Sequence, residues 1–185
     1  MLLPPRQSWA RALFSAFAVF ASVSLTGFAL AQSAQEYDLK AAFLLNFADY
    51  VEWPPEAGLA ADAPVRICLV GDDPFGDRID HLLKARPASK RPLILHRMEL
   101  ASAALNCHIA FIHRSTPDAL RQDLHVLADS VVLTVGQGPQ FEKAGGIISL
   151  GMREGRVQLF INLAQAQRHQ LTISSRLLSL AEVKQ

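Results

Sequence analysis

Several short segments of the chain are largely apolar and rich in branched side chains, which predicts strands that are buried on both faces. The clearest are 65–70, 107–113 and 131–136, and a further strand is predicted over 92–97. Parallel strands that lie between two layers of helices show such runs, whereas half-exposed strands alternate between apolar and polar residues.

Helical patterns lie between these strands. Over 37–53 the aromatic residues Phe43, Phe47 and Tyr50 recur at helical spacing, and Pro54 prevents the helix from continuing beyond Trp53. Further helices are predicted over 77–83 and 115–128. Strand and helix therefore alternate, which predicts an α/β fold with a mainly parallel sheet flanked by helices on both faces.

The pattern changes in the C-terminal part of the chain. The strands predicted over 147–150 and 156–162 are separated by a short loop that begins with Gly151 and ends with Gly155. Two strands joined in this way predict an antiparallel hairpin at the end of the sheet. Asn162 is expected to cap a helix over 163–169, and a last helix is predicted over 173–181.

Residues 1–31 have the organisation of a secretory signal peptide. Arg6 and Arg11 precede an almost uninterrupted apolar stretch that ends in Ala29-Leu30-Ala31. A basic start, an apolar centre and small residues before the cut are the features of such peptides, so we expect cleavage after Ala31. An uncleaved membrane anchor is the alternative, because about 20 apolar residues span a bilayer. In both cases residues 32–185 are expected to form one domain outside the cytoplasm.

The charge of the exported part is close to zero. Removal of residues 1–31 takes away two arginines and no acidic residue, which leaves 16 basic against 17 acidic side chains. A nearly neutral chain without a basic run argues against nucleic acid as a partner.

The chain contains two cysteines, Cys68 and Cys107. Because export delivers them to an oxidising compartment, we expect one disulfide between them; two free buried thiols are the alternative. A disulfide that closes a loop of about 40 residues stabilises the fold by about 4 kcal/mol in the chain-entropy model. Strand alternation over 107–113 places Cys107 on the same face as Phe111 and opposite to His108.

Residue types used in catalysis are present without the spacing that their chemistry needs. The turn from Asp72 to Gly76 follows a predicted strand, but it lacks the G-x-G-x-x-G spacing and its two aspartates would repel a phosphate. The six histidines are scattered, and no G-x-S-x-G motif occurs. We therefore expect no metal, no cofactor and no enzymatic activity.

The ordered set of these segments resembles the YfiR/HmsC-like family of exported bacterial proteins, which is also grouped as a domain of unknown function. The resemblance covers nearly the whole chain after residue 31. It rests on Lys40-Ala41-Ala42-Phe43-Leu44-Leu45-Asn46-Phe47, Val51-Glu52-Trp53-Pro54, Ile67 to Gly76, Cys107 to Ile112, Leu133 to Gly136, Phe141 with Gly145-Gly146-Ile147-Ile148, Arg156-Val157, Ile161-Asn162 and Ile173 to Leu178.

This resemblance implies a periplasmic regulator. Family members of the YfiR type bind the periplasmic part of an inner-membrane diguanylate cyclase and hold it inactive, which limits cyclic di-GMP and biofilm formation. An outer-membrane lipoprotein sequesters the repressor, and a second copy of the chain is a further candidate partner. The resemblance also places the family's disulfide on Cys68 and Cys107.

The chain departs from the family pattern at two places. Glu142 and Ser149 occupy the region where a better-known repressor has a second cysteine pair, so redox control by such a pair is not expected here. Phe160 stands where the family usually has an acidic residue, so a polar contact at that strand position is not carried over.

We predict two partner-contact regions, because aromatic residues are enriched at interfaces. The first is the end of the first helix, with Phe47, Tyr50 and Trp53, and the second is the late hairpin, with Ile148 and Phe160. Burial of these side chains in the core is the alternative for each. A small-ligand-binding module is the alternative function, because sheets of this kind bind ligands at the carboxyl ends of their strands.

Overall fold

The computed structural model describes residues 34–60, 63–88 and 90–184. The predicted signal peptide and its cleavage site after Ala31 lie outside the described residues. Within the described part of the chain, no helix is both long and apolar enough to span a bilayer.

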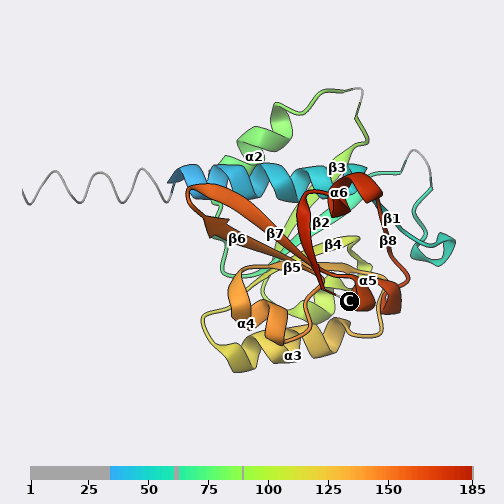
Figure 1. The fold of residues 1–185 in the computed structure, drawn as a ribbon. Helices are drawn as coiled ribbons and strands as arrows, with labels where there is room; N and C mark the ends of the chain where they lie inside the picture. The colour runs from blue at the N-terminus through green and yellow to red at the C-terminus, as the bar shows by residue number, and fades with distance from the viewer. Residues whose placement is uncertain (1–33, 61–62, 89, 185) are drawn as a thin grey trace, which may run out of the picture. The chain divides into compact units, whose positions relative to one another are not determined.

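The centre of the fold is a seven-stranded sheet with the strand order β3-β2-β4-β5-β6-β7-β9 (Figure 1). β3, β2, β4, β5 and β6 are mutually parallel, β7 is antiparallel to β6, and β9 is parallel to β7. This confirms the predicted mainly parallel sheet with a C-terminal antiparallel strand pair. After a helix over 34–46, the elements are η1 (Phe47–Asp49), β1 (Val51–Glu52), η2 (Pro55–Ala57), β2 (Val65–Gly71), α2 (Asp77–Lys84), β3 (Leu93–Met98), η3 (Ala101–Asn106), β4 (Ile109–His113), α3 (Pro117–Leu127), β5 (Leu133–Gly136), α4 (Gly138–Lys143), β6 (Ile148–Arg153), β7 (Arg156–Asn162), α5 (Leu163–Arg168), β8 (Thr172–Ile173), α6 (Ser175–Leu178) and β9 (Ala181–Lys184).

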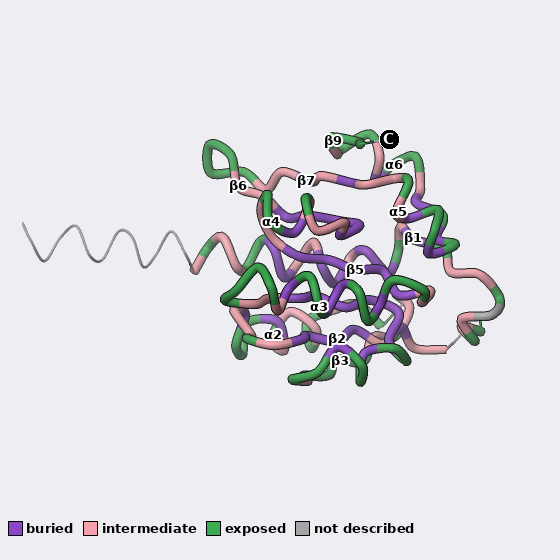
Figure 2. Tube along the Cα trace, turned by 90° about the horizontal axis from the view of Figure 1, so that it is seen from below, coloured by how far each residue is buried: buried purple, intermediate pink, exposed green. Residues whose placement is uncertain are grey.

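Two apolar layers enclose the sheet, one on each face. On one face Ile67 and Phe111 pack with the helix over 34–46 and with α2, and on the other Val70 and Ile112 pack with η3 and α3. Figure 2 shows that burial is concentrated in central strands such as β2 and β5, while the edge strand β9 and the outer surfaces of the helices are largely exposed. The unbroken apolar runs of β2, β4 and β5 follow from this arrangement, because both faces of these strands are covered.

Cys68 and Cys107 form the predicted disulfide, with their Cα atoms 6.2 Å apart. The predicted face of Cys107 is wrong. β4 begins only at Ile109, so Cys107 precedes the strand and does not follow its alternation. It lies with Cys68 and Ala110 on the α3 side of the sheet, opposite to Phe111.

The first helix ends at residue 46, not at Trp53 as the periodicity predicts. The chain continues through η1 into β1, where Val51 pairs with Ile173 of β8. Asp49 in η1 is held by Arg86 at 2.7 Å and by Lys90 at 2.8 Å. These partners come from distant parts of the chain, so a local pattern cannot reveal them.

The C-terminal segment also differs from the prediction. The last helix is confined to α6, and the chain then forms β9 beside β7. Residues 181–184 alternate between apolar and polar side chains, which is typical of a strand. In the hairpin, β6 continues to Arg153, and the turn consists of Glu154 and Gly155, both with positive φ (52° and 74°). Such two-residue turns match the twist of paired strands.

Candidate partner-binding surface

The antiparallel pair of β1 and β8 presents a mixed aromatic and polar surface. We call it the β1–β8 surface and define it as Tyr50, Glu52, Trp53, Thr172 and Arg176. The two aromatic side chains are half-buried, and the other three residues are exposed. The Ser174 amide donates a hydrogen bond to the Tyr50 carbonyl at 2.9 Å, so backbone pairing continues beyond β1. The Arg176 guanidinium carbon lies 5.9 Å from the centre of the Tyr50 ring, within range of a cation–π interaction.

Trp53 is fixed in place by His108 at the start of β4. Its indole nitrogen donates a hydrogen bond to the His108 carbonyl at 3.1 Å, and the two rings meet edge to face with centres 5.8 Å apart. The His108 side chain is 1% exposed, and its Nδ1 accepts a hydrogen bond from the Arg66 amide at 2.9 Å. Burial, with the positive charges of Arg66 and Arg91, lowers the pKa of His108 to about 4. At neutral pH Trp53 therefore rests against an uncharged, buried ring that is bonded through Nδ1.

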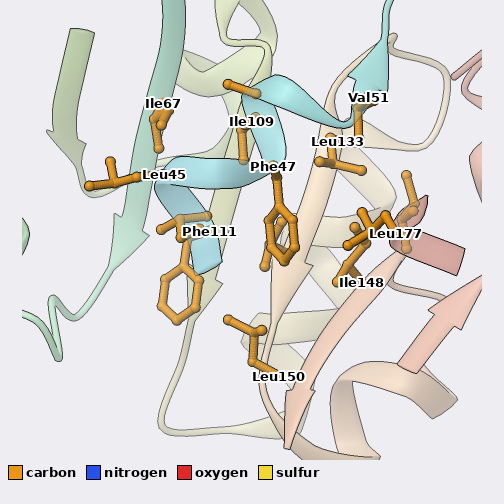
Figure 3. Packing of buried hydrophobic residues seen from close by; sticks show 14 of the residues in the cluster. Leu45, Phe47, Val51, Ile67, Ile109, Phe111, Leu133, Ile148, Leu150 and Leu177 are labelled. Atoms are coloured by element: carbon orange, nitrogen blue, oxygen red, sulfur yellow. The ribbon is translucent and has the colours of Figure 1, made fainter. Parts of the chain in front are cut away.

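Two of the five predicted contact residues do not reach the surface. Phe47 and Ile148 are each 0% exposed. Figure 3 shows both side chains in the core, among Phe111, Leu133 and Leu177. Their prediction as partner-binding residues is corrected accordingly: in this fold they stabilise the core, because Phe47 in η1 and Ile148 in β6 both point into the apolar layer between the helix over 34–46 and the sheet.

Phe160 is half-buried and lies apart from the β1–β8 surface. Its neighbours along β7, Leu159 and Ile161, point into the core that also receives Tyr50 and Trp53. Strand alternation turns Phe160 to the opposite face of the sheet. There it lines a shallow cavity of about 120 Å³ together with Glu142 and Glu182. Tyr50 and Trp53 thus flank β1 and pack on the same apolar core, and Phe160 is separated from them.

At the carboxyl end of β2, charged side chains satisfy one another. Asp73 accepts hydrogen bonds from the amides of Phe75 at 2.8 Å and Gly76 at 3.1 Å, and its second oxygen bonds Arg97 at 2.7 Å. Arg97 also binds Asp80 at 2.5 Å, and this hydrogen bond lowers the pKa of the Asp80 carboxyl. The turn from Asp72 to Gly76 is thus held by the carboxylate of Asp73, an arrangement that disfavours a phosphate.

A small cavity lies at the carboxyl ends of β4 and β5. Its volume is about 220 Å³, and its polar lining includes His113, Ser115, Thr116, Gln137 and Gln140. Arg114 at its edge bonds Asp123 at 2.6 Å and Glu99 at 2.8 Å, and these carboxylates raise the pKa of Arg114. Among the described residues, no three His, Cys, Asp or Glu side chains cluster as a metal site would require.

The sequence pattern does not reveal every surface feature. It does not single out Arg176, because only the β1–β8 pairing brings this residue to Tyr50. Exposed apolar side chains occur elsewhere, with Leu100 64% and Leu180 67% exposed. An apolar residue in a run gives no indication of its exposure until the neighbouring element is known.

Comparison with known proteins gives one match to a protein family and more distant similarities to solved structures. The family model described as YfiR/HmsC-like matches residues 37–182. No curated protein matches the chain. A conserved domain protein from Vibrio cholerae shares 17% identity at a TM-score of 0.47, over 65% of this chain and 54% of that one.

The ABC domain from Streptococcus pneumoniae, solved in complex with L-Trp, shares 9% identity at a TM-score of 0.51, over 81% of this chain and 59% of that one. The second similarity concerns the fold alone. The chain spans between half and two thirds of the length of both solved chains.

Proposed function

The chain belongs to the YfiR/HmsC-like family, and on that premise we propose that it binds the periplasmic sensor part of an inner-membrane diguanylate cyclase and represses the enzyme. The family is periplasmic, regulatory and non-catalytic. The match over residues 37–182 is the observation that carries the proposal, because it covers the sheet and both helical layers. Repression of this kind limits cyclic di-GMP and thereby biofilm formation.

The mechanism needs only a difference in affinity. A repressor shifts the conformational equilibrium of a sensor toward the inactive state. The size of the shift is set by the difference between the binding free energies of the repressor for the two conformations. A shift of the inactive to active ratio from 1:99 to 99:1 requires about 5.5 kcal/mol of differential binding. Two or three well-packed aromatic contacts supply such an amount, since hot-spot residues contribute about 2 kcal/mol or more each.

We assign this contact to the β1–β8 surface. Tyr50 and Trp53 offer aromatic area that is held by Arg176 and His108, so little side-chain entropy is lost on binding. Phe160 belongs to a second contact region on the other face of the sheet. An outer-membrane lipoprotein that covers either region would sequester the protein and release the cyclase, and a homodimer would bury one of them.

The test combines a deletion strain with point variants. Deletion of the gene is expected to raise the cyclic di-GMP concentration. Wild-type protein supplied to this strain is expected to lower the concentration again and to retain a membrane diguanylate cyclase in a pull-down. Tyr50→Ala and Trp53→Ala should lose both effects and still accumulate in the periplasm. Val126→Ala is the matched control, because this α3 side chain is 40% exposed and lies outside both contact regions. Unchanged cyclic di-GMP in the deletion strain, with no cyclase retained, would contradict the proposal.

The cavity at the ends of β4 and β5 favours a second candidate, a small-ligand-binding module. Carboxyl ends of parallel strands are the usual place for ligands in open α/β sheets, and this cavity has His113, Thr116 and Gln137 on its wall. Thermal shift measurements with amino acids, L-Trp among them, and with nucleotides separate the two roles. A ligand-dependent rise that His113→Ala abolishes supports ligand binding; no rise with any probe opposes it.

A further inference from the structure

A polar groove on the α3 side of the sheet plays no part in the proposed function. It has a volume of about 720 Å³, within the range of small-molecule sites. One wall is formed by α3, with Arg121 near its middle and His125 in its last turn, and by Asp129 just after the helix; the other is the end of α5. Thr134, Ala144 and Gly145 also line the groove.

The α5 wall contains a buried polar group whose hydrogen bonding is incomplete. His169 lines the groove and is 5% exposed, and its Nδ1 is among the buried atoms that find no hydrogen-bond partner in the described part of the chain. Burial lowers the pKa of His169, and hydrogen bonding to the backbone at Ser130 and Val132 offsets this only in part, so the ring is uncharged at neutral pH and can accept or donate a hydrogen bond. A buried polar atom of this kind is exceptional in folded proteins and calls for an explanation.

The charged side chains at the groove favour an acid group. Arg121 and Arg168 stand on opposite walls, and Asp129 is the acidic side chain that lines the groove. Arg121 pairs with Asp118, but both side chains are exposed, and such pairs exchange readily for other partners. Arg168 forms no ion pair with any described residue. Guanidinium groups suit carboxylates, which they bind through two parallel hydrogen bonds.

The rest of the lining favours hydroxyl groups. α3 and α5 end at the groove, and most of their last carbonyls accept hydrogen bonds from the backbone amides that follow each helix, so the helix ends contribute partial negative charge but few free acceptors. The amides of Gln165 and Gln170 add donors and acceptors. The two helix C-termini disfavour a simple anion, because each carries partial negative charge.

We propose that this groove binds an acidic sugar, a ligand in which several hydroxyl groups accompany a carboxylate. The carboxylate lies between Arg121 and Arg168, and the hydroxyls bond Gln165, Gln170 and the His169 ring. A soluble oligosaccharide and a segment of an envelope polysaccharide both present this chemistry. Stabilisation of the helix C-termini by basic residues also accounts for His125 and Arg168, but it leaves the His169 nitrogen unexplained.

Isothermal titration of the exported protein with trigalacturonate tests the proposal, with neutral maltotriose and inorganic phosphate as matched probes. Trigalacturonate is expected to bind, and Arg168→Gln to weaken binding at least about tenfold, which corresponds to 1.4 kcal/mol. Arg156→Gln is the control, because this exposed arginine starts β7 outside the groove and its loss should leave binding unchanged. Circular dichroism confirms that both variants are folded.

Three results would overturn the proposal: no binding of trigalacturonate at millimolar concentration, equal binding of maltotriose, or equal binding of phosphate. Retention on immobilised polygalacturonate identifies a polymer as the source of the ligand, and binding of the trisaccharide without retention identifies a soluble one. Neither result depends on the cyclase, so this test is independent of the proposed function.

Discussion

Acidification destabilises this domain partly through one side chain, His108. The folded protein holds the ring uncharged with a pKa of about 4, whereas an unfolded chain protonates histidine at about pH 6.5. Between these two values the unfolded state binds more protons, so the free energy of unfolding falls as the pH falls. The loss begins below about pH 6.5 and levels off only below about pH 4.

The difference between the two pKa values corresponds to about 3 kcal/mol in total, of which about 2 kcal/mol is lost by pH 5. That amount is a large share of the stability of a typical domain, about 5–15 kcal/mol. Burial of His169 acts in the same direction. A measurement must therefore isolate His108 from the other ionisable groups.

Urea unfolding at pH 7.5 and pH 5.0 provides this isolation when wild type is compared with His108→Asn. The asparagine carbonyl can accept the Arg66 amide hydrogen bond in place of Nδ1, and it carries no titrating group. The wild type is expected to lose about 2 kcal/mol more than the variant between the two pH values. His96→Asn is the control, because His96 is exposed on β3, and it should behave as the wild type does. Equal losses in wild type and His108→Asn would refute the reasoning.

Three further predictions concern stability. Replacement of Cys68 and Cys107 by serine should lower the free energy of unfolding by about 4 kcal/mol. In the same denaturation experiment, a reductant should lower the free energy of unfolding of the wild type and leave that of the variant unchanged. Gly146→Ala should lower the melting temperature, because a Cβ there would lie 1.9 Å from Cε1 of the buried Phe141 ring; an unchanged value would show that this contact relaxes freely. Phe47→Ala should cost about 3–5 kcal/mol in chemical unfolding, whereas Tyr50→Ala, at a half-buried site, should cost clearly less; similar losses for the two would contradict their placement.

The sequence predicts the layers of this fold well, because the layers follow from local patterns. Buried parallel strands are recognisable as apolar runs. Asn162 caps α5 as expected, and Thr116 caps α3 in the same way, each accepting a hydrogen bond from a backbone amide three residues later. The disulfide follows from the number of cysteines and from the compartment.

Features that depend on distant partners are not predicted. β1 and β9 are short strands whose partners, β8 and β7, lie in other parts of the chain. The same limitation affects the candidate surface. Phe47 and Tyr50 belong to one aromatic stripe, and only the position of the sheet shows that the first is buried and the second half-exposed.

The pairing of β1 with β8 joins the segment that enters the domain to one near its end. Contacts between residues so distant in sequence form slowly, because a long loop must close before they yield any gain. The β1–β8 surface is therefore expected among the last parts of the molecule to mature after export. A newly exported chain would thus become competent to recognise a partner only when its folding is complete.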